Sequence, residues 1–290
     1  MATTATKATN QRMHPTQQTT VIATDEEGKH VSTNRHAVTT SETNVASTRT
    51  RKLAIAAGIC YLITHVTSVS AVLLYGPILN NAAYVTGSGP DTGVLLGTFF
   101  DVILAMAIVG TAVALFPVVK RYNEGVALGY VGLRTLEAGI ITVGVLPLLA
   151  VVTLRQHLVG TIGADAGTLT TLASAFVELY KWTALVGPGL VCGVNTVLMA
   201  YIMYRSRLVP RFIPVLGLVG GPLVFAYSTA RMFGVSEQIP TWAAIGVIPI
   251  FTWEVSLALY LITRGFKPTA IAAMSSKPGE KQTEGLLSAA

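Results

Sequence analysis

Residues 93–121 read GVLLGTFFDVILAMAIVGTAVALFPVVKR, and this stretch decides the fold class. It holds one acidic residue, Asp101, in an otherwise uncharged, largely apolar run that ends at the basic pair Lys120-Arg121. The run exceeds the ~20 residues that an α-helix needs to cross a hydrocarbon core of ~30 Å. Because lipid offers no hydrogen bonds to the backbone, such a segment is expected to be a membrane-spanning helix.

Five further runs share these properties, so the sequence predicts an all-α, polytopic membrane protein built as a six-transmembrane-helix bundle. The expected spans are about 53–75, 93–119, 126–154, 182–204, 212–233 and 242–263. Composition agrees, because 51% of the 290 residues are hydrophobic and only 12% are charged, about half the charged share of a soluble domain. This composition argues against a soluble enzyme, a coiled coil and a fully disordered chain.

The basic residues predict the orientation of the bundle, because cytoplasmic loops are enriched in Lys and Arg. One side of the predicted spans carries ten of them, and the other side carries only Arg155 and Lys181. The ten are Arg49, Arg51, Lys52, Lys120, Arg121, Arg205, Arg207, Arg211, Arg264 and Lys267. Both termini are therefore expected in the cytoplasm, and the formal charge of +6 indicates topology rather than a nucleic-acid partner.

Three segments lie outside the expected spans. Residues 1–48 form a Thr-rich polar stretch that is expected to be a disordered cytoplasmic tail, and residues 269–290 are expected to be a flexible cytoplasmic tail. The domain between them is 49–268. In the outer loop 155–181, apolar residues recur at helical spacing over about 168–181. This pattern predicts an amphipathic helix that either lies at the interface, as a lid or a cover, or continues into the fourth span.

Ionisable residues inside the spans are the candidate functional residues, because a charge in hydrocarbon costs at least ~2.5 kcal/mol. They are His65, Asp101, Arg134, Glu137 and Glu254. Helical rise places His65, Glu137 and Glu254 roughly 16–20 Å from one end of their helices, near the midplane. The group predicts either a proton relay or substrate anchor, or an ion-pair network that only fixes helix packing.

The glycine and proline residues in the spans can serve helix packing or mark a binding cavity. Gly187-Pro188-Gly189 lies in the fourth span and predicts a helix break, either as a packing device or beside a binding cavity as in transporters. Four Gly-x-x-x-Gly pairs allow helices to approach closely, and a homo-oligomer through these faces is the partner they would support. The pairs are Gly93/Gly97, Gly125/Gly129, Gly189/Gly193 and Gly217/Gly221.

Motifs for soluble catalysis do not occur in the sequence. It has no phosphate-binding loop, dinucleotide fingerprint, His-Glu-x-x-His pair or nucleophile elbow. Cys60 and Cys192 each lie in an apolar run and are expected to be free thiols. No cofactor, no metal site and no catalytic residue is therefore expected, and the chain is not expected to be an enzyme.

Several stretches together resemble the bacterial, and especially the actinobacterial, membrane proteins of the DUF4386 family. They are 51–62 (RKLAIAAGICYL), 132–138 (GLRTLEA), 185–190 (LVGPGL), 204–211 (YRSRLVPR), 253–257 (WEVSL) and 265–268 (GFKP). The resemblance implies a six-helix protein of the bacterial cytoplasmic membrane, in which Arg134, Glu137 and Glu254 belong to recurring motifs. It implies no substrate. Two functions stay open: a small-solute or proton-coupled carrier, and a non-transporting structural or regulatory membrane protein.

Overall fold

The computed structural model of the chain describes residues 33–158, 165–235 and 242–275. Contacts divide the chain into two units, Met1–Val45 and Ala46–Ala290. Within the described residues all regular structure is helical, and six helices are long and apolar enough to cross a membrane. The expected all-α fold with six membrane-spanning helices is therefore confirmed.

The six spans are made by long helices, one of which changes its winding along its length. Five are continuous α-helices: α1 (Thr33–Leu74), α3 (Thr92–Val119), α4 (Glu124–Leu158), α7 (Phe212–Met232) and α8 (Trp242–Thr263). The fourth span consists of α5 (Ala166–Ala184), the π-helix η2 (Leu185–Val191) and α6 (Cys192–Ser206). The short helices are α2 (Gly76–Leu79), the 3-10 helix η1 (Ala82–Thr86) and α9 (Pro268–Ser275).

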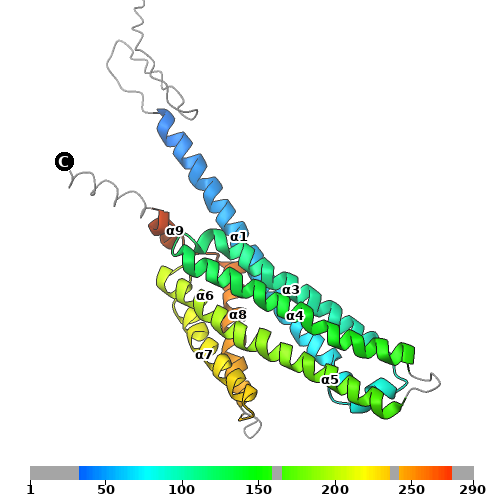
Figure 1. Ribbon diagram of the computed structural model, residues 1–290. Helices are drawn as coiled ribbons and strands as arrows, with labels where there is room; N and C mark the ends of the chain where they lie inside the picture. Colours follow the sequence, from blue (N-terminus) through cyan, green and yellow to red (C-terminus); the bar gives the residue numbers. More distant parts are fainter. Residues whose placement is uncertain (1–32, 159–164, 236–241, 276–290) are drawn as a thin grey trace, which may run out of the picture. The chain divides into compact units, whose positions relative to one another are not determined.

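The spans pack as neighbours in the order that short connections favour. Helices α3 and α4 lie side by side, α6 packs against α4 and α7, and α7 packs against α8 (Figure 1). Helix α1 packs on α8 and α3 at small residues, because Gly58 lies against Ala258 and Gly110 lies against Cys60. This arrangement brings α1, α4, α6 and α8 together around the bundle interior.

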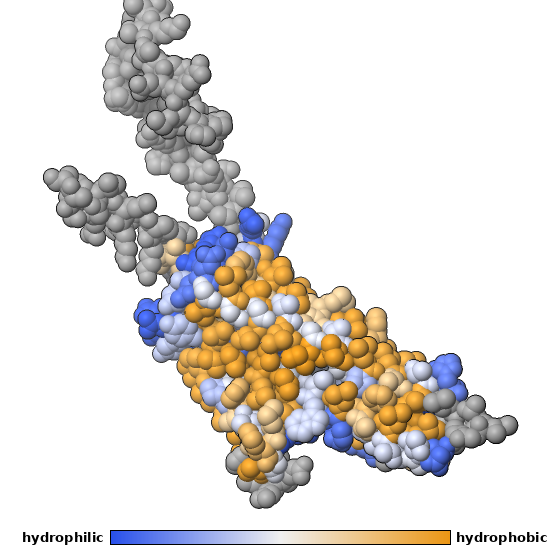
Figure 2. Space-filling view, viewed as in Figure 1, coloured by the Kyte–Doolittle hydropathy of each residue, from blue (hydrophilic) through white to orange (hydrophobic). Residues whose placement is uncertain are grey.

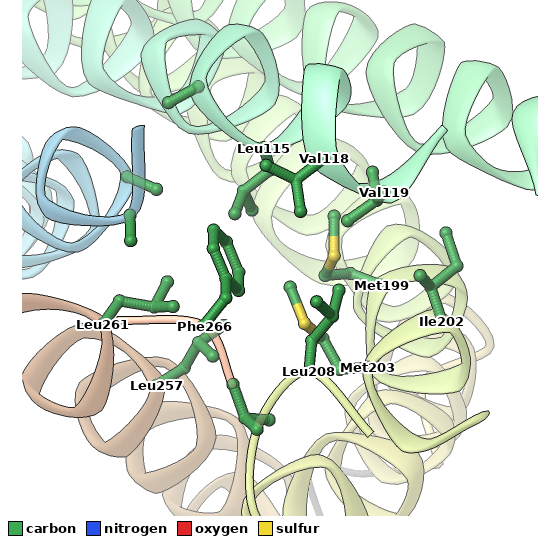
Figure 3. Close-up of a cluster of buried hydrophobic side chains, with 14 of the residues drawn as sticks. Leu115, Val118, Val119, Met199, Ile202, Met203, Leu208, Leu257, Leu261 and Phe266 are labelled. Carbon is green, nitrogen blue, oxygen red and sulfur yellow. The ribbon is translucent and has the colours of Figure 1, made fainter. Parts of the chain in front are cut away.

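The largest buried hydrophobic cluster closes the end of the bundle that carries Lys120 and Arg264, called the basic end below. The ring of Phe266 lies among apolar side chains from α3, α6 and α8 (Figure 3). It reaches this place because Gly265 takes a positive φ of 72°, which turns the chain back after α8. The guanidinium of Arg51 donates hydrogen bonds to the carbonyl oxygens of Leu261 and Ile262, and it thereby caps the end of α8.

The surface of the spans is apolar in a way that suits lipid. Large side chains such as Val66, Leu73 and Phe212 point outward and are exposed. In Figure 2 the visible surface is largely hydrophobic, and hydrophilic residues gather toward the two ends. A water-soluble protein rarely exposes apolar area on this scale, so the surface is compatible with contact to a bilayer.

Both tails differ from expectation over the part that the structure describes. Residues 33–48 were expected to be disordered, whereas α1 begins at Thr33, because extending an existing helix costs far less than nucleating one. Residues 269–275 were expected to be flexible, whereas they belong to α9. Pro268 starts this helix, and Ala270 and Met274 are buried one turn apart in the cluster at the basic end. Residues 1–32 and 276–290 lie outside the described residues.

The fourth span also settles two alternatives that the sequence left open. The amphipathic segment 168–181 lies within α5, which continues through η2 into α6 as one span, so it is not a separate helix. Its start is capped by Asp165, whose side chain accepts from the Thr168 backbone at 2.8 Å. Around Gly187, Pro188 and Gly189 the helix does not break but widens into η2, because a π-helical turn accommodates a proline without ending the helix.

The Gly-x-x-x-Gly pairs are used inside the chain. A Cβ on Gly193 would lie 2.9 Å from the carbonyl oxygen of Gly221, and a Cβ on Gly221 would lie 2.7 Å from that of Gly193. Helices α6 and α7 therefore approach closely at these two residues. Gly97 and Gly129 likewise face other parts of the same chain, and the homo-oligomer that these pairs suggested stays a prediction.

Candidate functional site

Three of the five intramembrane candidates meet in one ion-pair network. Arg134 of α4 donates to Glu137 Oε2 at 3.1 Å and to Glu254 Oε1 of α8 at 2.8 Å. Helical geometry explains the first contact, since residues three apart share a face. The second joins residues 120 positions apart and depends on how α8 is rotated. Arg134, Glu137 and Glu254 are 2%, 3% and 7% exposed, so all three are withdrawn from solvent and lipid.

Two tyrosines and one asparagine complete the surroundings of the guanidinium. Tyr130 accepts from Arg134 Nε at 3.2 Å, and its hydroxyl lies 3.0 Å from that of Tyr61. The rings of Tyr61 and Tyr130 lie 5.3 and 5.8 Å from the guanidinium carbon, within the range of a cation–π contact. Asn195 of α6 donates to Glu137 Oε2 at 2.7 Å. These neutral partners hold the charges in a fixed arrangement.

Sequence reasoning missed Asn195, although it is fully buried and polar. Its Nδ2 is satisfied by Glu137, while its Oδ1 has no hydrogen-bond partner within the described part of the chain. An unpaired buried acceptor costs free energy, so this oxygen marks a place that could accept from water or a bound group. An asparagine in an otherwise apolar span was the signal that would have found it.

His65 of α1 lies at the edge of the network. Its Nδ1 is 2.8 Å from the backbone oxygen of Tyr61, and its Nε2 is 3.7 Å from Glu254 Oε2. The ring packs edge-on against Phe251, with centroids 4.7 Å apart. We call Arg134, Glu137, Asn195, Glu254 and His65 the central cluster.

Asp101 does not join the central cluster. Its Oδ2 accepts from the hydroxyl of Tyr75 at 2.7 Å, and no basic side chain lies within ion-pair distance in the described residues. Gly97, one turn earlier on the same face of α3, leaves room for the Tyr75 ring, since a Cβ there would lie 2.6 Å from that ring. The sequence placed Asp101 among the candidates but could not show that it lies apart.

The end of the bundle opposite the basic end, called the distal end, holds a second polar cluster that sequence reasoning did not single out. Arg155, near the end of α4, donates to Asp91 Oδ1 at 2.8 Å, to Gly87 O at 3.1 Å and to Gly89 O. Tyr84 donates to the same Asp91 oxygen at 2.8 Å. The guanidinium thus ties the loop before α3 to α4.

We call Arg155, Asp91 and Tyr84 the Arg155 clamp. Burial and hydrogen bonding have opposite effects on the pKa of Asp91 in this clamp. Burial acts to raise the pKa of Asp91, but hydrogen bonds from Gln156 and Tyr84 and the charge of Arg155 outweigh burial and hold the pKa below its ordinary value. Burial, together with the hydrogen bond to Asp91, raises the pKa of Tyr84. Asp91 therefore stays ionised and Tyr84 neutral over the physiological range.

A pocket of about 280 Å³ opens at the distal end between α5, α4 and the segment 76–86. Its floor is apolar and buried, with Ile78, Val85 and Val151 among the lining residues. Glu178 and Lys181 form an exposed ion pair of 2.7 Å at its rim. The pocket does not include any residue of the central cluster.

Other chemistry is sparse in the described part of the chain. No group of three His, Cys, Asp or Glu side chains is placed there to hold a metal ion. Cys60 and Cys192 are free thiols, as expected, and Cys192 is buried. The polar chemistry of the described spans therefore resides mainly in the central cluster and the Tyr75–Asp101 pair.

Comparison with known proteins adds one family and no relative of known activity. A search of curated proteins found no match, and a search of solved structures found none. The model of one family, described as a domain of unknown function (DUF4386), matches residues 56–265. This match covers most of the chain and includes every member of the central cluster. The chain therefore belongs to the DUF4386 family, and it is a multi-pass helical protein of the membrane-spanning type.

Proposed function

We propose that the protein is a proton-coupled carrier of a small solute, and not an enzyme, with the central cluster as its proton-binding site. We place it in a bacterial cytoplasmic membrane with both termini inside the cell, because the ten basic residues gather on one side of the spans. The charge balance of the cluster supports this function. Arg134 carries one positive charge and contacts two carboxylates, Glu137 and Glu254, so the ionised group has one negative charge in excess.

The contact between His65 and Glu254 is the observation that carries the proposal. A carbonyl oxygen can only accept a hydrogen bond, so His65 Nδ1, which contacts Tyr61 O, carries a hydrogen. In the neutral ring Nε2 then has a lone pair, and it faces the Glu254 carboxylate oxygen at 3.7 Å. Two acceptors facing each other in a buried site are unfavourable. One proton, on either His65 or Glu254, removes the conflict and also cancels the excess charge.

A group that binds one proton in the middle of a membrane protein suits coupling to the proton gradient. The proposal is tested with inside-out vesicles that contain the full chain and a pH-sensitive dye. Addition of a panel of small solutes should produce proton movement with at least one of them. Glu254→Gln and His65→Asn should abolish this movement while protein amount stays unchanged. Glu178→Gln, in the exposed pair at the distal end, should leave it intact.

Two outcomes would contradict the carrier. One is a wild-type protein that moves no protons with any solute of the panel. The other is a Glu254→Gln variant with undiminished solute-dependent proton movement, because the proton site would then lie elsewhere.

The second candidate is a non-transporting membrane protein whose network only holds the helices together. One observation favours it: Arg134, Glu137 and Asn195 are 0–3% exposed, and the pocket of the distal end does not reach them. Under this function, water has no access to the cluster. Loss of one charged partner should then lower protein stability by ~3–5 kcal/mol without any effect on proton movement.

A further inference from the structure

Asp101 lies in the half of α3 nearer the distal end, in surroundings that suit the neutral form of its carboxyl group. The residue is 7% exposed and its described hydrogen-bond partner is the neutral hydroxyl of Tyr75, at 2.7 Å. Arginine, lysine or histidine partners are lacking within 4.0 Å among the described residues. This contrasts with Glu137 and Glu254, which share Arg134.

The surroundings of Asp101 and Tyr75 are aromatic and apolar. Tyr75 comes from the end of α1, and Tyr180 of α5 packs edge-on against it, with ring centroids 5.4 Å apart. The buried residues of α4 in the same cluster, among them Leu148 and Val152, are apolar. Among the described residues, the titratable groups next to Asp101 are Tyr75, which donates to it, and Tyr180, which packs on Tyr75, and neither supplies a positive charge.

Two residues that line the pocket at the distal end are close in sequence to the tyrosines of this site. Ile78 lies one turn beyond Tyr75, and Val177 lies one turn before Tyr180, and both line the pocket. Tyr75, which is bonded to Asp101, and Tyr180, which packs on Tyr75, are thus each one helical turn from a residue that lines the pocket.

We propose that Asp101 and Tyr75 form a second proton-binding site, separate from the central cluster, in which Asp101 is held as the neutral acid at neutral pH. A buried carboxylate without a cation is far less favourable than the protonated acid. The proton comes from water, and the 2.7 Å contact accommodates a bond in either direction. With the carboxylate, Tyr75 donates to Asp101; with the acid, the carboxyl O–H can donate to the Tyr75 oxygen. The site stands whether or not the protein transports a solute.

Infrared spectroscopy of the purified full-length protein tests the proposal, because a protonated carboxyl group absorbs at a frequency where a carboxylate does not. The chain has four aspartates, Asp25, Asp91, Asp101 and Asp165. Labelling all aspartate carboxyl carbons with ¹³C should shift a protonated-carboxyl band at pH 7 to lower frequency. Asp91 and Asp165 do not contribute, since hydrogen bonds hold the pKa of each below its ordinary value, against the effect of burial.

Variants assign the band and test its independence. Asp101→Asn should remove the label-sensitive band, and Tyr75→Phe should shift it, because the hydroxyl partner is lost. Glu254→Gln should leave it unchanged, which separates this site from the proton site of the proposed carrier. The first test uses the labelled wild-type protein and therefore does not depend on whether a variant folds. The inference is overturned if this protein shows no label-sensitive protonated band at pH 7. It is also overturned if the band survives Asp101→Asn.

Discussion

Replacement of Arg134 by methionine tests whether the central cluster holds the bundle together. The guanidinium makes two charge-assisted hydrogen bonds, to Glu137 and Glu254, each worth ~1.5–3 kcal/mol. Methionine is of similar length and apolar, so the main effect is to leave two buried carboxylates without a cation. Breaking a buried pair in this way costs ~3–5 kcal/mol. With ~2–4 °C per kcal/mol for domains of 150–250 residues, Tm should fall by about 6–20 °C.

Because the excess charge of the central cluster is negative, loss of a carboxylate and loss of the arginine should lower Tm by different amounts. Glu254→Gln leaves Arg134 and Glu137 as a balanced pair, so it should lower Tm by less than half as much as Arg134→Met. Glu178→Gln serves as a control, because the Glu178–Lys181 pair is exposed and such pairs contribute ~0–1 kcal/mol. Thermal unfolding of the detergent-solubilised protein, followed by circular dichroism, measures all three.

The reasoning fails if Arg134→Met melts within about 2 °C of the wild type, because the charges would then not be coupled as the distances indicate. It also fails if Glu254→Gln is the more damaging change. In that case the network would need both carboxylates ionised, and the argument that one negative charge is in excess would be wrong.

Three further predictions follow from packing, electrostatics and topology. Gly193→Ala places a Cβ 2.9 Å from backbone of α7 and should lower Tm, whereas Gly139→Ala, where nothing lies within 4 Å, should leave it unchanged or raise it. Because the folded pKa of Asp91 lies below its unfolded value of ~3.9, its contribution to stability is complete above about pH 5 and is lost as pH falls through the lowered pKa. Hydrogen exchange over residues 82–91 should accordingly be slower in wild type than in Asp91→Asn at pH 6, and the difference should shrink as the pH falls below the unfolded pKa of ~3.9. Reporter fusions at Gly89 and Lys120 should report opposite compartments, with Lys120 in the cytoplasm, and the same compartment for both would contradict the proposed topology.

The sequence predicted local features well because they depend on neighbouring residues. Apolar run length indicated six spans, and the part of the chain that the structure describes contains six helices of that kind. The contact between Arg134 and Glu137 follows from their spacing of three residues. The ends of the elements were harder to predict, since the helices α1 and α9 extend into segments that composition alone assigned to tails.

The candidate residues themselves were chosen from the sequence, but their grouping was not. In the sequence, Asp101 and Glu254 are both single acidic residues in apolar runs. In the structure, Glu254 forms an ion pair with Arg134, whereas Asp101 accepts a hydrogen bond from Tyr75. The difference arises from rotation and depth of each helix, which hydropathy does not encode. Asn195 and the Arg155 clamp were missed for the same reason, because their partners are distant in sequence.

The sequence by itself determined that the chain spans a membrane six times, because the cost of placing backbone in lipid acts on each segment separately. Only the tertiary structure decided which charges meet, that His65 Nε2 faces Glu254, and that a pocket lies at the distal end. Those features depend on side-chain packing between helices, where a turn of one helix about its axis exchanges one set of partners for another.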